Sequence, residues 1–479
     1  MNLEAIAERL RQLAPSADYW SARIVASAGE HLRVRQGVAL PPTLEQDLGV
    51  FVTVIDGDGI GYAATSNVTE AGLAAAFVTA RRWAENTRGR LALDPRAAPR
   101  ATARGGYTAP VAVPWDSQPL DVKLDWLVST CQALRISDEI VDWEASLGHE
   151  QRDSWFLSSA GAEVRQRFDY LFPGYEAVAS RGSLTQIRSG GGAGTGRQGG
   201  LELLTGFGFP DAARTAAEEA LQLLDARECP HDRRDLLLMP SQMVLQIHES
   251  IGHPLELDRI LGDERNYAGT SFVKPEMFGH YRYGSEHLNV TFDPSVPGEL
   301  VSYGFDDEGT PAQPVHLIRN GRLERPLGGT LSQLRSGLPG TANARASNWN
   351  RPAIDRMANL NIEPGPHTLN DLIARVERGV IMESNRSWSI DDSRNKFQFG
   401  CEIGWLIRDG ERREIVRNPN YRGVSANFWR NLSAVGDAST WRVSGVVNCG
   451  KGEPNQSVYV GHAAPACLFN DIEVFGGEA

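Results

Sequence analysis

Two histidines and a glutamate form a compact motif near the middle of the chain, His248-Glu249-Ser250-Ile251-Gly252-His253. Two imidazoles that flank a carboxylate are typical of a site for a divalent transition metal, with the glutamate left free as a base. In the familiar zinc-hydrolase motif H-E-x-x-H, the histidines are four residues apart and share one face of an α-helix. Here they are five residues apart, which in a regular α-helix rotates the second histidine by about 140° relative to the first.

A shared face therefore requires a local change in the helix. A π-bulge has i→i+5 turns, so it would bring His253 back beside His248, and such bulges favour functional sites. Gly252 has no side chain to resist the deformation, and Pro254 disfavours the α conformation at His253. The sequence predicts a helix that widens at the motif and ends or kinks near Pro254.

Two histidines are too few for catalytic zinc, which usually takes about three protein ligands. Among the five cysteines, Cys449 has the most suggestive setting, because a short apolar strand delivers it to a Gly-rich turn and Lys451 nearby would favour the thiolate. Glu256 is a competing third ligand, since some zinc peptidases use a downstream glutamate, or it could orient a ligand histidine. His462 could also approach the site, although an ordinary hydrogen bond is the more common role for such a residue.

The motif and the cysteine turn, together with two further blocks, resemble the TldD/PmbA family of peptidases. The order and separation of these blocks fit nearly the whole chain, and the combination of H-E-x-x-x-H with a distant cysteine is the specific part. The four blocks are His248–His253, Asn448–Gly452, Asp306–Pro311 and His316–Gly321.

The resemblance implies zinc held by His248, His253 and Cys449, with Glu249 as the general base. The PmbA (TldE) side of the family lacks these ligands, so the chain resembles the metal-bearing TldD type. The family also implies hydrolysis of unstructured or leader peptides, including maturation of modified peptide products, and assembly with a PmbA-type partner or as a homodimer. One departure is the stretch Pro254–Arg259, which differs from the Gly-initiated, more acidic run of the best-known members and bears on substrate preference.

Other kinds of site are less favoured by the sequence. A peptide-binding subunit with purely structural zinc would need a fourth protein ligand, and iron or copper redox chemistry is disfavoured because no 2-His-1-carboxylate set lies on strands. The acidic turn Asp306-Asp307-Glu308 is typical of a solvated turn rather than a calcium site. The Gly-rich run 190–200 lacks the Gly-Lys-Ser/Thr ending of a P-loop, so no nucleotide cofactor is expected.

Composition narrows the class of protein. The chain has 479 residues, enough for two or three domains, and 48 Lys+Arg against 60 Asp+Glu. A spread net charge of -12 disfavours nucleic acid and anionic membranes as partners. No run approaches the roughly 18 apolar residues of a transmembrane helix, and the N-terminus predicts an amphipathic helix rather than a signal peptide. Five scattered cysteines favour a reducing cytoplasm over a disulfide framework.

Periodicity predicts an α+β protein. Residues 1–230 are expected to form an α/β domain, and residues 231–479 a mostly antiparallel β domain that carries the metal-binding helix. Asp-Gly between apolar alternations predicts a hairpin, and Thr69 is a plausible N-cap of the helix that follows it. The expected segments are helices at 2–13, 69–86, 120–136 and 211–226, extended stretches at 19–28 and 31–37, and hairpin strands at 49–55 and 60–64.

Overall fold

The computed structural model describes residues 2–190 and 194–477 of the chain. Part of the Gly-rich run, residues 191–193, lies outside the described residues. The architecture mixes helices with several sheets, which confirms the predicted α+β class. Helices and strands alternate in the first half, whereas the second half is mostly strands interrupted by short helices. The division at residue 230 stays a prediction.

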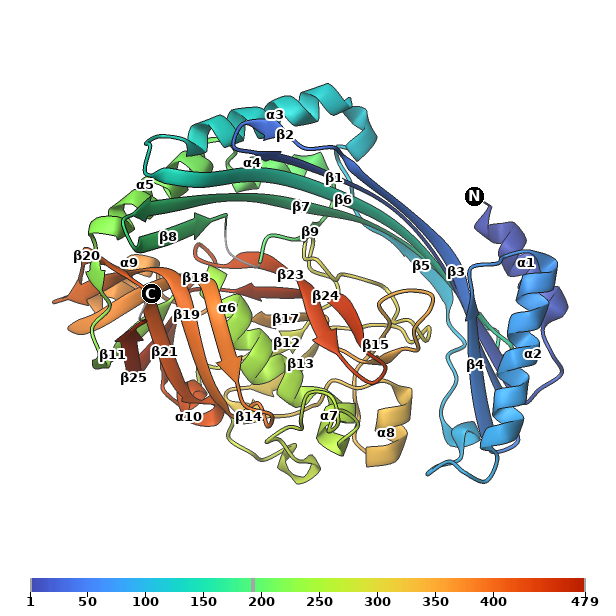
Figure 1. Cartoon of the computed structure of the whole chain (residues 1–479). Coiled ribbons are helices and arrows are strands. Elements are labelled where there is room, and N and C mark those ends of the chain that lie inside the picture. Colours follow the sequence, from blue (N-terminus) through green and yellow to red (C-terminus); the bar gives the residue numbers. More distant parts are fainter. Residues whose placement is uncertain (1, 191–193, 478–479) are drawn as a thin grey trace.

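A long curved sheet forms the first half and arches over the rest of the protein (Figure 1). Its order is β4-β3-β1-β6-β7-β5, with β2 beside β1 and both β8 and β9 beside β7. Neighbouring strands are antiparallel, except β5, which runs parallel to β7. The strands are β1 (Tyr19–Arg35), β2 (Val38–Ala39), β3 (Thr43–Asp56), β4 (Gly59–Thr65), β5 (Arg104–Thr108), β6 (Ile140–Ser158), β7 (Glu163–Arg181), β8 (Leu184–Ser189) and β9 (Arg197–Gln198).

Two of the predicted extended stretches are in fact one strand. β1 continues through Gly29, which pairs with Glu45 of β3 on one side and Glu150 of β6 on the other. Pairing on both sides satisfies the backbone groups of a residue that has little strand preference of its own. The expected hairpin is confirmed as β3 and β4.

Helices cover the outer face of the arch (Figure 1). The predicted N-cap is confirmed, because the Thr69 side chain accepts a hydrogen bond from the Gly72 N–H. Helix α2 packs closely on β4, where a Cβ atom at Gly61 would lie 2.1 Å from the Ala80 carbonyl oxygen. The helices of this half are α1 (Leu3–Leu13), α2 (Glu70–Thr87), α3 (Leu120–Leu134), α4 (Leu204–Phe207) and α5 (Asp211–Asp225).

The second half contains two main sheets. In the first, β18, β11, β25, β21 and β19 close into a ring, because β19 pairs with both β18 and β21. Its strands are β10 (Arg227–Glu228), β11 (Asp232–Leu238), β18 (Arg378–Ile390), β19 (Lys396–Arg408), β20 (Glu411–Arg417), β21 (Pro419–Val424), β22 (Leu432–Val435) and β25 (Cys467–Gly476).

The other sheet has the order β14-β13-β12-β17-β24-β23, so β23 is an edge strand. Its strands are β12 (Val290–Phe292), β13 (Val315–Arg319), β14 (Arg322–Leu323), β17 (Asn359–Ile362), β23 (Arg442–Lys451) and β24 (Gln456–Ala464). A short separate pair is β15 (Ala344–Arg345) with β16 (Ile354–Asp355). The helices of this half are α6 (Pro240–Ile247), α7 (Leu257–Leu261), α8 (Thr330–Ser336), α9 (Leu369–Ala374) and α10 (Ser425–Arg430).

Helix α6 lies between these two sheets, in contact with β18 on one side and with β23 and β24 on the other (Figure 1). Residues on all its sides are buried, including the polar Gln242 and Gln246. A helix enclosed in this way cannot move independently of the sheets, because interiors are close-packed. The residues that follow α6 are therefore held at the centre of the second half.

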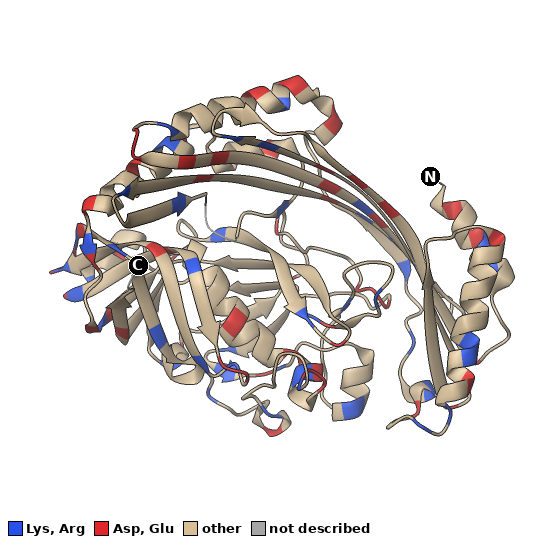
Figure 2. Ribbon diagram, in the orientation of Figure 1, with Lys and Arg blue, Asp and Glu red and all other residues tan. Residues whose placement is uncertain are grey.

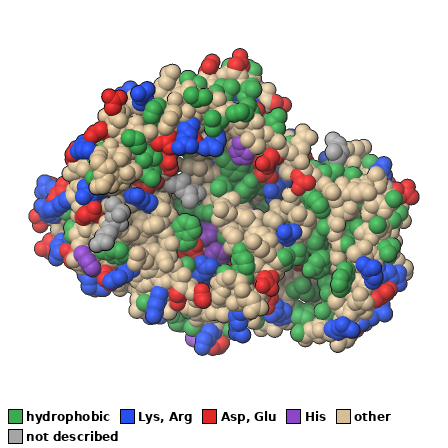
Figure 3. Space-filling view, in the orientation of Figure 1, with side chains coloured by type: hydrophobic (Ala, Val, Ile, Leu, Met, Phe, Trp, Pro, Cys, Tyr) green, Lys and Arg blue, Asp and Glu red, His purple; other side chains and the backbone are tan. Residues whose placement is uncertain are grey.

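The surface is hollowed between the arch and the second half, and hydrophobic side chains line part of this hollow (Figure 3). One cavity of about 360 Å³ lies between the end of the first sheet and the loops around α8, with Ile60, Leu91, Leu331 and Ile354 among its apolar walls. Charges of both signs are spread over the layers in view (Figure 2). This mixture agrees with the sequence-based expectation of a dispersed charge.

A buried ion cluster ties the first sheet to the ring of strands. Arg188 of β8 contacts Glu402 of β19 at 2.7 Å, Glu383 of β18 at 3.1 Å and Glu219 of α5 at 2.8 Å. The side chains of Arg188 and Glu402 are each only 5% exposed. The Ser189 hydroxyl also donates to Glu402. The cluster thus joins segments more than 200 residues apart in the sequence.

Arg188→Met should lower the stability strongly, because it leaves the buried carboxylate of Glu402, and the partly exposed one of Glu383, without their cation. Loss of one partner of a buried pair costs about 3–5 kcal/mol. The measurement is the midpoint of urea unfolding, compared with Arg227→Ala, which removes one partner of an exposed pair with Glu414. If the two variants unfold at the same urea concentration, the cluster does not hold the halves together.

Candidate metal centre

The chain widens into a π-helical turn directly after α6, over His248–Gly252. The His253 backbone N–H donates to the His248 carbonyl, which is the i→i+5 bond of a π turn. The predicted bulge is therefore confirmed. It brings the two imidazoles together, with ring centroids 4.9 Å apart and the rings nearly perpendicular.

Gly252 and Pro254 act locally as the sequence predicts. A Cβ atom at Gly252 would lie 2.5 Å from the Met357 sulfur, so only glycine lets the π turn pack this closely against its neighbour. The π turn gives way at His253 to a short 3₁₀ turn, His253–Leu255, with Pro254 in its first positions. The predicted end of the regular helix is confirmed.

Cys449 reaches the histidines from the edge strand β23. The register between β23 and β24 shifts between Val446 and Cys449, where three steps along β23 oppose two along β24. The extra residue is a β-bulge, a device that re-aims side chains next to active sites. Val447 and Asn448 are exposed while Cys449 is buried, so the bulge turns the thiol inward.

The three side chains converge on one point. Ligand atoms of His248, His253 and Cys449 all lie within 4.8 Å of one another, and the Cys449 sulfur is 3.5 Å from Nε2 of His253. Within the described ranges, no other set of three His, Cys, Asp or Glu residues is gathered in this way. Two imidazoles and a thiolate suit zinc and other borderline or soft transition metals. The group could hold a metal ion.

A hydrogen-bond chain sets the tautomer of His248. Nδ1 of His462 lies 3.1 Å from the Leu360 carbonyl oxygen, which only accepts, so that nitrogen carries the proton. Nε2 of His462 then accepts from Nδ1–H of His248, over 2.9 Å. This leaves Nε2 of His248 with a free lone pair. Burial lowers the pKa of His248 to about 4 and that of His462 well below its usual value, so both rings are neutral at pH 7.

Glu256 orients the second histidine. Its Oε2 accepts from Nδ1 of His253 at 2.9 Å, and its Oε1 accepts from the Met357 backbone N–H at 3.1 Å. Burial alone would raise the pKa of Glu256, but Lys451 and His253 hold it well below its usual range. Of the two roles considered for Glu256, this arrangement supports orientation of a ligand histidine.

Arg356 stabilises the thiolate of Cys449, a role that the sequence analysis assigned to Lys451. Its Nη2 donates to the Cys449 sulfur at 3.0 Å and also to the Cys449 carbonyl. Burial alone would raise the pKa of Cys449, but Arg356 and then His253 bring it below the usual value. Lys451 donates instead to Asp258, at 2.5 Å, and to the backbone of Asp355. Alternate residues of a strand share a face, so the sequence favours Lys451, whereas Arg356 lies 93 residues before Cys449 and nothing in the sequence signals its contact with the sulfur.

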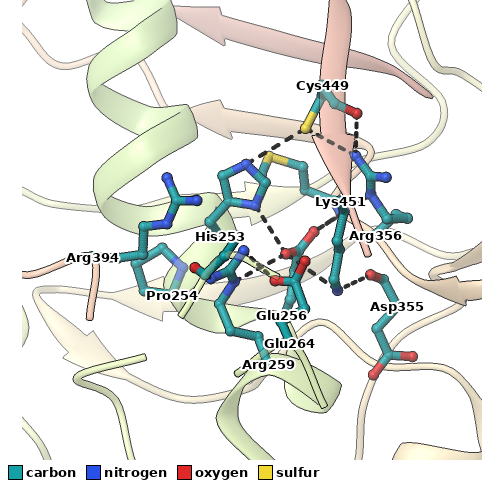
Figure 4. A network of polar contacts seen from close by, with 12 residues as sticks. His253, Pro254, Glu256, Arg259, Glu264, Asp355, Arg356, Arg394, Cys449 and Lys451 are labelled. Atoms are coloured by element: carbon teal, nitrogen blue, oxygen red, sulfur yellow. Dashed lines mark hydrogen bonds and ion pairs between the residues drawn. The ribbon is translucent and has the colours of Figure 1, made fainter. Parts of the chain in front are cut away.

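These contacts belong to one buried charge network beneath the site (Figure 4). Four carboxyl groups and three cations share it, and burial raises the pKa of three of the carboxyls while Glu256 stays ionised. Its members are Glu256, Asp258, Arg259, Glu264, Asp355, Arg356 and Lys451.

Glu249 is buried in the π turn beside His248. Its Oε2 accepts from Nη1 of Arg394, which lies in the turn between β18 and β19. The negative charge of Glu249 acts to raise the pKa of His248 against the larger effect of burial. Arg394 has no sequence signal, because it lies 145 residues from Glu249 and in no motif.

The acidic turn has a different environment from the one predicted. Asp306 is buried rather than solvated, and its carboxylate accepts from the backbone N–H groups of Glu308, Thr310 and Ala344. Asp307 likewise accepts from the Ala346 N–H. These oxygens therefore cap backbone groups of loops that surround the hollow.

None of the described helices is both long and apolar enough to cross a membrane.

Three protein relatives show where the chain belongs. A metalloprotease of Methanothermobacter thermautotrophicus is 30% identical over 350 residues, covering 73% of each chain. A metalloprotease TldD homologue of Haemophilus influenzae is 24% identical over 96% of this chain and 93% of the relative. A zinc metalloprotease TldD homologue of Saccharolobus solfataricus is 30% identical over 42% of each chain.

Solved structures share the fold at low sequence identity. A candidate modulator of a DNA gyrase from Thermotoga maritima superposes with a TM-score of 0.78 at 18% identity, covering 99% of this chain and all of the other. TldE from Thermococcus kodakarensis superposes with a TM-score of 0.71 at 16% identity, over the same shares of the two chains. These likenesses establish the architecture.

Models of three family domains match the chain in order. They are the PmbA/TldA metallopeptidase domain 1 at residues 20–84, the central domain at 113–224 and the C-terminal domain at 232–476. The last of these contains the π turn and the bulged strand. With the relatives above and the gathered histidines and cysteine, the matches establish that the chain belongs to the PmbA/TldA metallopeptidase family, also called TldD/PmbA.

Proposed function

We propose that the chain is a zinc-dependent peptidase of the metal-bearing TldD type, which hydrolyses unstructured or leader peptides. The observation that carries the proposal is the convergence of His248, His253 and Cys449, with Glu249 in the same turn. The PmbA side of the family lacks these donors, so their convergence here favours the TldD type. The proposed ligands are the two histidines and the cysteine, and the proposed base is Glu249.

Zinc is the metal that best suits the donors. Each histidine has its Nδ1 engaged by a second residue and presents Nε2, and the cysteine is held as the thiolate by Arg356. Such outer partners fix ligand orientation at zinc sites. When bound, zinc polarises a peptide carbonyl and lowers the pKa of a water molecule toward neutrality. The relative described as a zinc metalloprotease supports the same choice of metal.

Glu249 performs the proton transfers in this proposal. Its carboxylate accepts a proton from the attacking water and passes it to the leaving amine, the role that the same residue has in H-E-x-x-H hydrolases. The Glu249 side chain is only 7% exposed, so its carboxylate has limited contact with solvent. A purely structural zinc would instead need a fourth protein ligand, and within the described residues the donor group has three members.

We propose that the substrate pairs with the free edge of β23. Among the described residues, Thr195 forms a bridge with Gly445 at the start of this edge, and on the side of β23 that faces away from β24 no strand pairs with the stretch from Val446 to Lys451. An extended peptide on this stretch would lie beside Cys449. Main-chain pairing accepts varied side chains, which suits unstructured peptides of different sequence.

A partner would complete the enclosure of the site. The fold shared with a solved TldE supports a TldD/TldE-type assembly, in which a PmbA-type subunit covers the hollow beneath the arch. A homodimer is the other arrangement that would cover it.

All five cysteines are unpaired and buried, which supports the proposal that the protein works in a reducing cytoplasm.

Removal of a ligand should remove the metal without unfolding the chain. Cys449→Ser keeps an acceptor for Arg356 but replaces the soft donor, so the purified protein should lose most of its zinc. Elemental analysis measures the zinc, and circular dichroism checks the fold. The matched control is Cys131→Ser on α3, far from the site in the fold, which should retain zinc. A full complement of zinc in Cys449→Ser would refute the assignment of the third ligand.

Glu249→Gln should separate metal binding from chemistry. Glutamine still accepts a hydrogen bond from Arg394 but cannot take a proton, so zinc content and peptide affinity should persist while cleavage slows by at least about 10²-fold. Cleavage of a fluorogenic disordered peptide measures the rate, with the exposed Glu276→Gln as the control. Wild-type rates in Glu249→Gln would favour the structural-zinc alternative.

Strand pairing makes a prediction about the substrate backbone. A disordered peptide should be cleaved without ATP, whereas a thermostable folded domain should be spared. N-methylation of alternate amides that face β23 should block cleavage, because it removes ladder donors, and N-methylation of the other alternate amides should not.

Mass spectrometry of the products measures all four cases, with the chain alone and with a PmbA-type protein. Equal cleavage of the peptide and the folded domain would contradict the proposal that the substrate pairs with the edge of β23. Equal cleavage of the two N-methylated series would contradict it as well. Full activity of a monomeric sample would rule out the need for a partner.

A further inference from the structure

Arg394 lies in the turn between β18 and β19 and reaches the metal centre from the side. In Figure 4 it stands on the opposite side of His253 from Arg356. Its Nη1 donates to Oε2 of Glu249, and the side chains of the pair are 13% and 7% exposed. An ion pair this deeply buried is costly to form, so its presence next to the proposed base requires an explanation.

The backbone of Arg394 is held in an unfavourable conformation. Its φ is +60°, in the left-handed region that residues with side chains seldom occupy. The Ser425 hydroxyl donates to the Arg394 carbonyl at 2.9 Å, and the Ser425 N–H donates to the Asn395 carbonyl at 2.7 Å. The Asp391 carboxylate accepts from the backbone N–H groups of Asn395 and Lys396. The turn is thus over-determined, as is common where strain serves function.

The same turn is bonded to the segment that follows the metal-binding motif. The Thr270 and Phe272 N–H groups donate to the Asp392 and Ser393 carbonyls, at 2.8 and 2.7 Å. The hydroxyl of Ser271, between them, donates to the Pro254 carbonyl at 2.7 Å. These bonds fix the position of the Arg394 turn relative to the π turn that carries Glu249.

The contact with Arg394 leaves Glu249 with two unequal oxygens. Oε2 is committed to the guanidinium. Oε1 forms no hydrogen bond with any of the described residues, and it is not among the buried side-chain atoms that lack a partner, so it keeps some solvent-accessible surface. Glu249 therefore presents one defined oxygen from an otherwise buried carboxylate.

We propose that Arg394 is a positioning residue for Glu249: it holds Oε2 so that Oε1 faces the water molecule to be deprotonated. The inference rests on the proposed role of Glu249 as the base. Arginine suits this task because its guanidinium is planar, always charged and rigid in its donor geometry. A carboxylate without this partner would rotate freely about its last bond, and a base placed loosely transfers protons less often in the right geometry.

The variant that isolates this role is Arg394→Gly. Glycine adopts φ near +60° without strain, which offsets part of the cost of leaving Glu249 without its cation, so this variant should fold but should melt at a lower temperature than the wild type. Zinc content and peptide Kd should be unchanged, whereas kcat should fall by about 10-fold to 100-fold, as for other outer partners of catalytic groups. Added guanidinium ion should restore part of kcat in Arg394→Gly, and Arg394→Lys should be intermediate.

The matched control is Lys396→Ala, which removes an exposed positive charge two residues away in the same turn and should leave kcat unchanged. Wild-type kcat in Arg394→Gly would overturn the proposal, and so would a loss of zinc, because the residue would then be structural.

A crystal structure of Arg394→Gly gives a readout independent of activity. The Glu249 carboxylate should be displaced or spread over several orientations, and an unchanged carboxylate would overturn the proposal. If the wild-type chain cleaves no peptide at all, the proposed function fails, while the position of Glu249 in this crystal structure still decides the role of Arg394.

Discussion

The buried ion contacts of Glu256 and Arg356 are the constraint on which the metal centre depends. Glu256 holds His253 from the helical side, and Arg356 holds Cys449 from the strand side. The two are themselves linked, because Nε of Arg356 lies 3.8 Å from Glu256 and Nζ of Lys451 lies 3.3 Å from it. Loss of one member of a buried ion network typically costs about 3–5 kcal/mol. The turn that carries His253 and the edge strand that carries Cys449 are thereby joined through buried charges that pair with one another.

The layered fold explains how such a network stays dry. Helix α6 is enclosed by the ring of strands on one side and the six-stranded sheet on the other, so the π turn emerges at the centre of a close-packed core. The bulge in β23 then turns the Cys449 side chain inward, directly after two residues that face solvent. Two local irregularities, a widened helix turn and an extra strand residue, suffice to bring three donors within 4.8 Å. Each departs from regular geometry, and each lies at the site.

The two arginines near the site have complementary tasks. Arg356 and Arg394 lie on opposite sides of His253 in Figure 4. Arg356 bonds to the cysteine sulfur, and Arg394 bonds to the carboxylate of Glu249. The first favours a thiolate that can bind metal; the second, in our proposal, leaves one carboxylate oxygen for proton transfer. The free edge of β23 lies next to the sulfur, so a substrate backbone paired there would meet both functions. In the proposed mechanism, this division would separate metal binding from proton transfer, so that each could be altered alone.

The sequence by itself determined several elements of the first half and the candidate donors His248, His253 and Cys449. Local periodicity placed the hairpin and α2 with its N-cap, and the five-residue spacing of His248 and His253 required the π turn, because a regular helix would have separated the rings. Only the tertiary structure decided that Arg356 rather than Lys451 faces the sulfur, that Glu256 and His462 bond to His253 and His248, and that Arg394 meets Glu249. These pairs join residues from different elements, mostly far apart in the chain. Their choice depends on how the sheets pack, and local sequence carries no signal for that.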